Sequence, residues 1–212
     1  MEKEIKNVVF DLGRILVSLD DNRCMEAFRQ AGIGRIADYV EQHRVEAFFL
    51  EAEKGLIDQH TFCEKVRAAA GSDISDEAIV LAWNQLLTGI PEEKKELVLR
   101  LRRSGLRTFM LSNTNYMHWK WCEAQFCQHG MQPSDYFEHI FLSYEMHLVK
   151  PDRKIFEQTA AQAGIDPAQT LFIDDSADNC ESARAVGFQT FNDPEGTQWP
   201  GMARRKLLHE NN

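Results

Sequence analysis

The 212-residue sequence lacks the long apolar runs, the basic excess and the paired cysteines that mark several large classes of protein. No apolar stretch approaches the roughly 18 residues that span a bilayer, so we expect no membrane segment, and no signal peptide before the first strand. The net charge of −9 disfavours a nucleic-acid binder, which needs a basic face. Five cysteines, an odd number without short paired spacings, indicate reduced thiols and a cytoplasmic location.

The sequence also lacks internal repeats, low-complexity segments and any linker rich in proline or glycine. His118, Cys122, Cys127 and His129 are all metal-ligand types, but they lack the CxxC spacing of zinc sites and lie in a helical pattern that points them in different directions. We therefore expect no zinc there. The length suits one sizeable core, or a core that carries a smaller insertion.

Residues 20–88 show only helical periodicity. Apolar residues recur at three- and four-residue spacing in successive runs, and each run closes on a glycine that can end a helix. This pattern predicts a small helical bundle. The runs cover residues 22–32, 35–55, 58–71 and 75–89.

After Pro91 the pattern alternates between helix and strand. Strands separated by helices predict a parallel sheet that is covered on both faces. The apolar run VVFD, residues 8–11, is too short to fold alone and should be another strand of that sheet. Helices are expected at 92–105, 152–164 and 176–187, and strands at 106–112, 138–143, 170–175 and 188–192.

We therefore predict an α/β fold, with a doubly wound Rossmann-like parallel sheet core and an α-helical bundle cap inserted after the first strand. The core would comprise residues 1–18 and 89–212, and the cap residues 19–88. Residues 192–212 should form a loop and a short final helix. Trp119 and Trp121 are expected to be core or half-buried packing residues rather than a dimer contact, and we expect a monomer or a weak homodimer.

Polar residues collect at the carboxyl ends of the predicted strands, which is where open parallel sheets bind their ligands. Taken singly, Ser112 is compatible with a helix cap and Lys150 with a solvated charge. Carboxylates gathered on one rim repel each other unless a cation lies between them, and oxygen ligands without a thiolate favour Mg²⁺. With a lysine and a hydroxyl to bind an anion, the set predicts phosphoryl transfer with an aspartate as covalent nucleophile. The set is Asp11, Ser112, Lys150, Asp174 and Asp175, and the same strand ends also carry Asn113, Thr114, Asp178 and Asn179.

The same residues resemble the motifs of the haloacid dehalogenase (HAD) superfamily. FDLG, LSNT, the lysine of VKPD and FIDDSADN match those motifs in order over nearly the whole chain, the first of them in part. EKGLI, residues 53–57, resembles the glycine-centred cap loop that reads the substrate. The combination is most similar to the subgroup of alpha-D-glucose-1-phosphate phosphatases.

The resemblance implies catalytic and substrate-binding roles. Asp11 would be the nucleophile that forms an aspartyl-phosphate, and Lys150 would neutralise both Asp11 and the developing phosphoryl charge. Ser112 and the backbone amide of Asn113 would hold the phosphoryl oxygens. Glu53, in the cap loop, would contact the substrate.

The resemblance also implies a magnesium site and its support. Asp11, the backbone carbonyl of Gly13, Asp174 and Asp175 would hold Mg²⁺. Asn179 would orient either the acidic pair or Lys150 from behind.

Gly13 departs from the family pattern. Phosphatases of the family carry a second aspartate at this position, which protonates the leaving group and then activates water. Such acid–base catalysis is worth about 10²- to 10⁴-fold. Asp20, Asp21 and Glu53 are the nearest candidates to replace it.

We favour a Mg²⁺-dependent phosphatase of a small phosphorylated metabolite, with a sugar phosphate as the substrate that the resemblance implies. The enzyme would tolerate the loss of the aspartate at Gly13 because its substrate has a good leaving group, as a sugar 1-phosphate does, or because another group replaces the aspartate. One alternative is a catalytically weak or inactive protein that binds a phosphorylated ligand. The other is a dehalogenase-like hydrolase that attacks carbon, which needs neither a leaving-group acid nor a metal.

Overall fold

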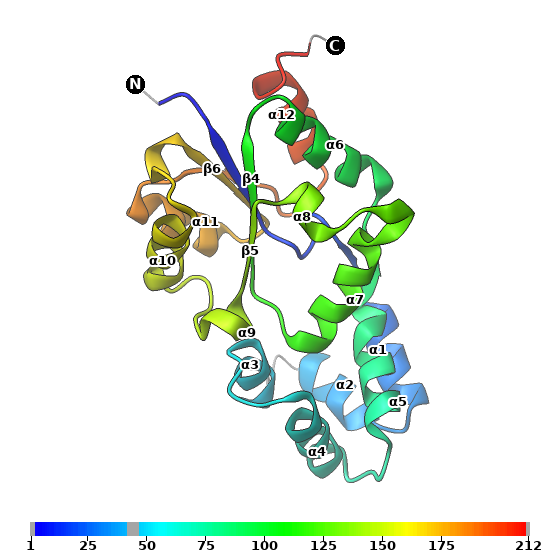
Figure 1. Ribbon diagram of the computed structural model, residues 1–212. Helices are drawn as coiled ribbons and strands as arrows, with labels where there is room; N and C mark the ends of the chain where they lie inside the picture. Colours follow the sequence, from blue (N-terminus) through cyan, green and yellow to red (C-terminus); the bar gives the residue numbers. More distant parts are fainter. Residues whose placement is uncertain (1–2, 42–46, 211–212) are drawn as a thin grey trace.

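A five-stranded parallel sheet lies at the centre of the computed structural model, which describes residues 3–41 and 47–210 (Figure 1). The strand order is β5-β4-β1-β6-β7, and all neighbours pair in parallel. β1 is flanked by β4 and β6, so the chain reverses its direction across the sheet beside β1 and leaves a ligand-binding crevice there. The strands are β1 (Asn7–Phe10), β4 (Arg107–Ser112), β5 (His139–Leu142), β6 (Thr170–Asp174) and β7 (Gln189–Asn192).

Buried apolar side chains alternate between the two faces of the central strands. Val8 and Phe10 of β1 join one buried cluster with Met110, whereas Val9 joins the opposite cluster with Phe109. Because successive residues of a strand point to opposite faces, a strand that is apolar at every position needs cover on both sides. The predicted doubly wound α/β fold is confirmed by this two-sided packing.

Helices cover both faces of the sheet. The first face packs against α6 (Glu92–Arg103), α7 (Tyr116–Phe126), α8 (Pro133–Tyr136) and α12 (Trp199–Lys206). The second packs against α10 (Arg153–Ala163) and α11 (Ala177–Val186). The short helix α9 (Ser143–Met146) follows β5, and 3₁₀ turns lie at η2 (Gln128–Gly130) and η3 (Pro167–Gln169). α12 is the short final helix that the sequence predicts.

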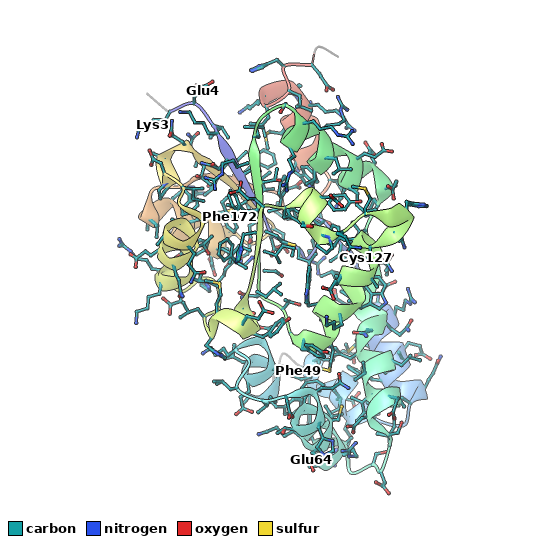
Figure 2. All side chains as sticks on the ribbon, viewed as in Figure 1. Lys3, Glu4, Phe49, Glu64, Cys127 and Phe172 are labelled. Atoms are coloured by element: carbon teal, nitrogen blue, oxygen red, sulfur yellow. The ribbon has the colours of Figure 1, made fainter. Side chains whose placement is uncertain are left out.

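A helical bundle is inserted between β1 and β4 and lies at one end of the sheet (Figure 1). It has its own buried cluster, in which Phe49 stacks on Trp83 with ring centroids 4.6 Å apart and 13° between the ring planes. Figure 2 labels Phe49 in this bundle and Phe172 in the sheet. The bundle helices are α1 (Asp21–Gln30), α2 (Gly34–Glu41), α3 (Ala47–Glu53), α4 (Gln59–Ala70) and α5 (Asp76–Trp83).

Two short strands bring the ends of the bundle together. β2 (Ser18–Leu19) pairs antiparallel with β3 (Leu87–Gly89), so the chain enters and leaves the bundle at neighbouring positions. The helix expected over 75–89 therefore ends early, at Trp83, followed by η1 (Asn84–Leu86), because pairing with β2 overrides the local helical pattern. The helical run expected at 35–55 forms α2 and α3, and its residues 42–46 lie outside the described residues.

Trp119 is buried in the cluster on the first face of the sheet, and Trp121 packs against it while partly buried. The expectation that both are packing residues is confirmed. Within residues 3–41 and 47–210, no helix has the length and apolar character to cross a bilayer; α4 and α6 have 12 residues each.

Candidate active site

The carboxyl ends of the three central strands bring an aspartate, a serine and a second aspartate to one place. The register pairs Phe10 with Met110 on one side and with Ile173 on the other, so the residues that follow lie at the same level of the sheet. Asp11 is 6% exposed, and Asp174, the last residue of β6, is 0% exposed. Carboxylates buried this deeply need charged or hydrogen-bonding partners.

Lys150 is the charged partner of both aspartates. Its Nζ lies 2.7 Å from Oδ1 of Asp11 and 2.6 Å from Oδ2 of Asp174. Burial alone would lower the pKa of Lys150, but attraction to the two carboxylates outweighs it and raises that pKa, so the lysine is charged. Asn113 fixes its backbone, since the side-chain amide donates to the Lys150 carbonyl at 2.9 Å and accepts from the Lys150 N–H at 2.8 Å.

Asp11, Asp174 and Asp175 form an acidic cluster that one lysine does not neutralise. Each offers a carboxylate oxygen, and these oxygens lie within 4.8 Å of one another. Burial raises the pKa of Asp11 to about 7, with repulsion from Asp174 adding to it and Lys150 opposing it. Burial and the charge of Asp174 also raise the pKa of Asp175. Crowded oxygen donors with uncompensated negative charge fit a divalent cation such as Mg²⁺.

Asp174 is held in place from several directions. Its Oδ1 accepts hydrogen bonds from the Ser176 N–H at 2.8 Å and from Nδ2 of Asn179 at 2.9 Å, while Oδ2 faces the lysine. Asn192, which the sequence did not single out, donates to the carbonyls of Asp174 at 3.2 Å and Asp175 at 2.9 Å. Asn179 therefore contacts the acidic pair and not Lys150. These contacts fix the orientation of the carboxylates before any ligand binds.

Ser112 leaves its hydroxyl available beside this cluster. The residue is 1% exposed, and within the described part of the chain its hydroxyl makes no hydrogen bond. A buried hydroxyl without a protein partner is suited to a ligand that supplies an acceptor.

Gly13 is not required for space. A Cβ at this position would lie 3.7 Å from Cδ1 of Leu19 and 3.8 Å from Oδ2 of Asp11, which are ordinary contact distances, and its φ is not in the left-handed region. The next residue, Arg14, places Nε 3.5 Å from Oδ2 of Asp175. An aspartate would therefore fit at position 13, so the glycine is not explained by a lack of space for a side chain.

The end of α3 contacts the sheet domain through α9, as the ribbon shows (Figure 1). Ser143 Oγ lies 2.7 Å from the carbonyl oxygen of Glu53 and accepts a hydrogen bond of 2.9 Å from the Thr114 N–H. One hydroxyl thus joins the backbone beside Ser112 to the backbone of the bundle. Ser143 was not predicted from the sequence, although its place directly after β5 at the same edge of the sheet was a usable signal.

Two further contacts hold this junction. His147 Nδ1 lies 2.8 Å from the carbonyl oxygen of Lys54. Gly55 has φ +62°, and a Cβ there would overlap the carbonyl of Tyr144. The close approach of two backbones explains why a glycine stands at this position in EKGLI.

Comparison with known proteins identifies the family of this chain. Residues 5–187 match the family of haloacid dehalogenase-like hydrolases. The chain is 29% identical over 196 residues to the D-ribitol-5-phosphate phosphatase of Bacteroides thetaiotaomicron, and the match covers 92% of this chain and 95% of that protein.

Solved structures of the same family are also similar to this chain. A HAD family enzyme from Bacteroides thetaiotaomicron, crystallised with magnesium and inorganic phosphate, is 41% identical with a TM-score of 0.87, covering 93% of this chain and 98% of the other. A HAD-like family hydrolase from Porphyromonas gingivalis is 30% identical with a TM-score of 0.86, covering 99% and 100%. The superfamily prediction is confirmed, and the glucose-1-phosphate subgroup stays a prediction. The chain belongs to the family of haloacid dehalogenase-like hydrolases.

Proposed function

We propose that this protein is a Mg²⁺-dependent phosphatase of a small phosphorylated metabolite and that it acts through an aspartyl-phosphate on Asp11. The observation that carries the proposal is the ammonium group of Lys150, which lies within 2.7 Å of Asp11 and 2.6 Å of Asp174 in a buried site. The similarity to a D-ribitol-5-phosphate phosphatase supports a sugar phosphate or sugar-alcohol phosphate as the substrate.

In this proposal Asp11 attacks phosphorus, and the bond from phosphorus to the leaving alcohol breaks. The free hydroxyl of Ser112 and the backbone amide of Asn113 hold the phosphoryl oxygens. Lys150 stabilises the negative charge that develops on them, in a site where burial strengthens electrostatic interactions. Its charge also lowers the pKa of Asp11, which opposes the larger upward shift from burial.

Asp11, Asp174, Asp175 and the carbonyl of Gly13 would hold Mg²⁺. The ion would supply a positive charge against the phosphoryl oxygens. Asn179 and the backbone around Asp174 keep the carboxylates oriented for this role.

The proposal also assigns separate roles to the two parts of the chain. Residues 1–18 and 89–212 form the catalytic core, and residues 19–88 form a cap that selects the substrate. Glu53, at the end of α3, is the cap residue next to the site, because its backbone is joined to Thr114 through one serine hydroxyl. Most of the buried cluster of the cap comes from its own helices, with Met117 of α7 added, so the contacts of the cap with a substrate can change while the sheet stays intact.

A phosphate-release screen over sugar and sugar-alcohol phosphates, with Mg²⁺ and with EDTA, tests the function. We expect metal-dependent release that disappears in Asp11→Asn, while Asp73→Asn, an exposed aspartate of the bundle, keeps wild-type rates. Release that is indifferent to both EDTA and Asp11→Asn would overturn the proposal. Phosphate binding without turnover would favour a binding protein, and halide release from 2-haloacids would favour a dehalogenase-like hydrolase.

A further inference from the structure

The active site has a nucleophile and charge stabilisers, but Gly13 leaves it without the side chain that moves protons. The sequence offers Asp20, Asp21 and Glu53 as candidates to transfer those protons instead. The three residues differ in the exposure of the side chain, in the partners of the carboxylate and in the contacts of the backbone.

Asp20 and Asp21 are already engaged in local structure. Asp20 is exposed and caps α1, since its Oδ1 accepts from the Arg23 N–H at 2.9 Å. The side chain of Asp21 is 68% exposed and pairs with Arg14 at 3.2 Å. Both side chains are already used in contacts at the protein surface, so neither is as well suited to a general acid beside a buried nucleophile as an unpaired carboxyl would be.

Glu53 differs in both respects. Its residue is half-buried, and within the described residues its carboxylate makes no hydrogen bond or ion pair. Burial raises its pKa, and attraction to Lys150 opposes that shift. A carboxyl that holds its proton more readily than usual is suited to donate it to a leaving group.

The backbone of Glu53 is also fixed relative to the site. Ser143 Oγ ties its carbonyl oxygen, at 2.7 Å, to the backbone of Thr114, two residues beyond Ser112. Lys54 and Gly55, the next residues along the chain, are held against α9 by His147 and by the close approach to Tyr144. Contacts on three consecutive residues position the end of α3 more firmly than a loop tip.

We propose that Glu53 is the general acid and base of the reaction and replaces the aspartate that Gly13 lacks; this inference rests on the proposed phosphatase function. In the first step the protonated carboxyl gives its proton to the ester oxygen as Asp11 bonds to phosphorus and the alcohol leaves. In the second step the Glu53 carboxylate takes a proton from water. The water oxygen bonds to phosphorus, the bond from Asp11 breaks, and inorganic phosphate leaves with Glu53 protonated again.

The test compares leaving groups in Glu53→Gln. 4-Nitrophenolate leaves without a proton, whereas the alcohol of D-ribitol 5-phosphate or glycerol 3-phosphate needs one. In single-turnover measurements, we expect Glu53→Gln to slow alcohol release from the alkyl phosphates by about 10²-fold or more and nitrophenolate release by much less. Glu64→Gln, on α4 of the bundle (Figure 2), is the matched control and should change neither rate.

A second variant adds a gain of function. Gly13 has room for a side chain, so Gly13→Asp installs the acid that family phosphatases carry. We expect the double variant Gly13→Asp/Glu53→Gln to recover alkyl phosphate turnover relative to Glu53→Gln, which a merely structural role for Glu53 would not allow.

Three outcomes would overturn the inference: unchanged rates in Glu53→Gln, equal losses on both leaving groups, or no recovery in the double variant. Equal losses on both substrates would make Glu53 a substrate contact. A wild-type protein that releases no phosphate from any substrate would remove the proposed function as well, so the two failures are distinguishable. Matching thermal unfolding of wild type and Glu53→Gln checks that the variant folds.

Discussion

The carboxyl edge of the sheet and the interior of the helical bundle are both buried, yet opposite kinds of contact hold them together. At the sheet edge, Asp11, Lys150 and Asp174 are linked by ion pairs and hydrogen bonds. In the bundle, Phe49 and Phe62 pack around Trp83 with ring centroids 4.6 to 5.9 Å apart. Charges that depend on one another cannot be removed singly, whereas an apolar cluster tolerates changes that conserve volume.

This difference indicates how the two regions divide the work of the protein. The sheet edge is specified residue by residue, because each charge needs its partner at hydrogen-bond distance. The bundle is specified mainly by the amount and spacing of apolar surface, and its contact with α9 depends on single residues such as Gly55. Mutations in the two regions should therefore fail in different ways.

The largest effect is expected at the sheet edge. Lys150→Met removes the cation from two buried carboxylates, so we expect the free energy of unfolding to fall by about 3–5 kcal/mol at neutral pH. Phosphate release should fall by about 10²- to 10³-fold or more, because the charge on the phosphoryl group loses its stabiliser. Urea denaturation and initial rates measure the two effects.

Lys154→Met, an exposed lysine of α10, is the matched control for Lys150→Met and should leave both quantities near wild type. A Lys150→Met protein as stable as wild type would show that the two carboxylates do not need their cation. That result would remove the contrast between the two regions.

An intermediate effect is expected at the junction. Gly55→Ala and Gly32→Ala both place a Cβ on a backbone with positive φ, at +62° and +79°, but only the first Cβ meets another backbone. Gly32→Ala should therefore cost about 1 kcal/mol of stability with normal activity. Gly55→Ala should also lower kcat/KM by about 10- to 100-fold, because the end of α3 moves away from the site. Equal kcat/KM values in the two variants would contradict this account of the junction.

The smallest effect at neutral pH concerns a buried histidine at the edge of the bundle. His118 of α7 is buried with its ring stacked on Trp83, at a centroid distance of 5.1 Å, and burial lowers its pKa from 6.5 to about 4. The unfolded chain therefore takes up a proton first as the pH falls. The free energy of unfolding should be unaffected above about pH 6.5 and should decrease toward pH 4, by on the order of 2 kcal/mol at pH 5.

Urea denaturation of wild type and of His118→Phe, at a series of pH values, measures the contribution of this histidine. The phenylalanine keeps a stacked ring but cannot titrate, so its stability should fall less between pH 7 and pH 5 than that of wild type. Parallel pH profiles would show that His118 does not link the bundle to pH.

Much of the site could be predicted from the sequence, because its residues directly follow short apolar strands. Asp11, Ser112 and Asp174 stand at strand ends that a parallel sheet must bring to one edge. Ser143 and Asn192 lie at the same edge but escaped prediction, since a single serine or asparagine after a strand is common without any function. Their importance comes from partners far along the chain, such as Glu53 for Ser143.

The pairing of β2 with β3 could not be predicted for a related reason. Its strands are two and three residues long, too short for a period of two to stand out from the helical pattern around them. Only the return of the chain to the start of the bundle brings them together.

The α/β order of elements, the helical insertion and the acidic residues at the strand ends can be read from the amino-acid sequence, because apolar periodicity and strand boundaries are local properties of the chain. Which atoms come into contact depends on the folded chain. In the fold, the Lys150 ammonium lies between Asp11 and Asp174, and the side chain of Asn113 hydrogen-bonds to the Lys150 backbone. The Ser143 hydroxyl links the backbones of Glu53 and Thr114. Hydrogen bonds between residues distant in sequence depend on ångström-scale positions that only the packed sheet and helices fix.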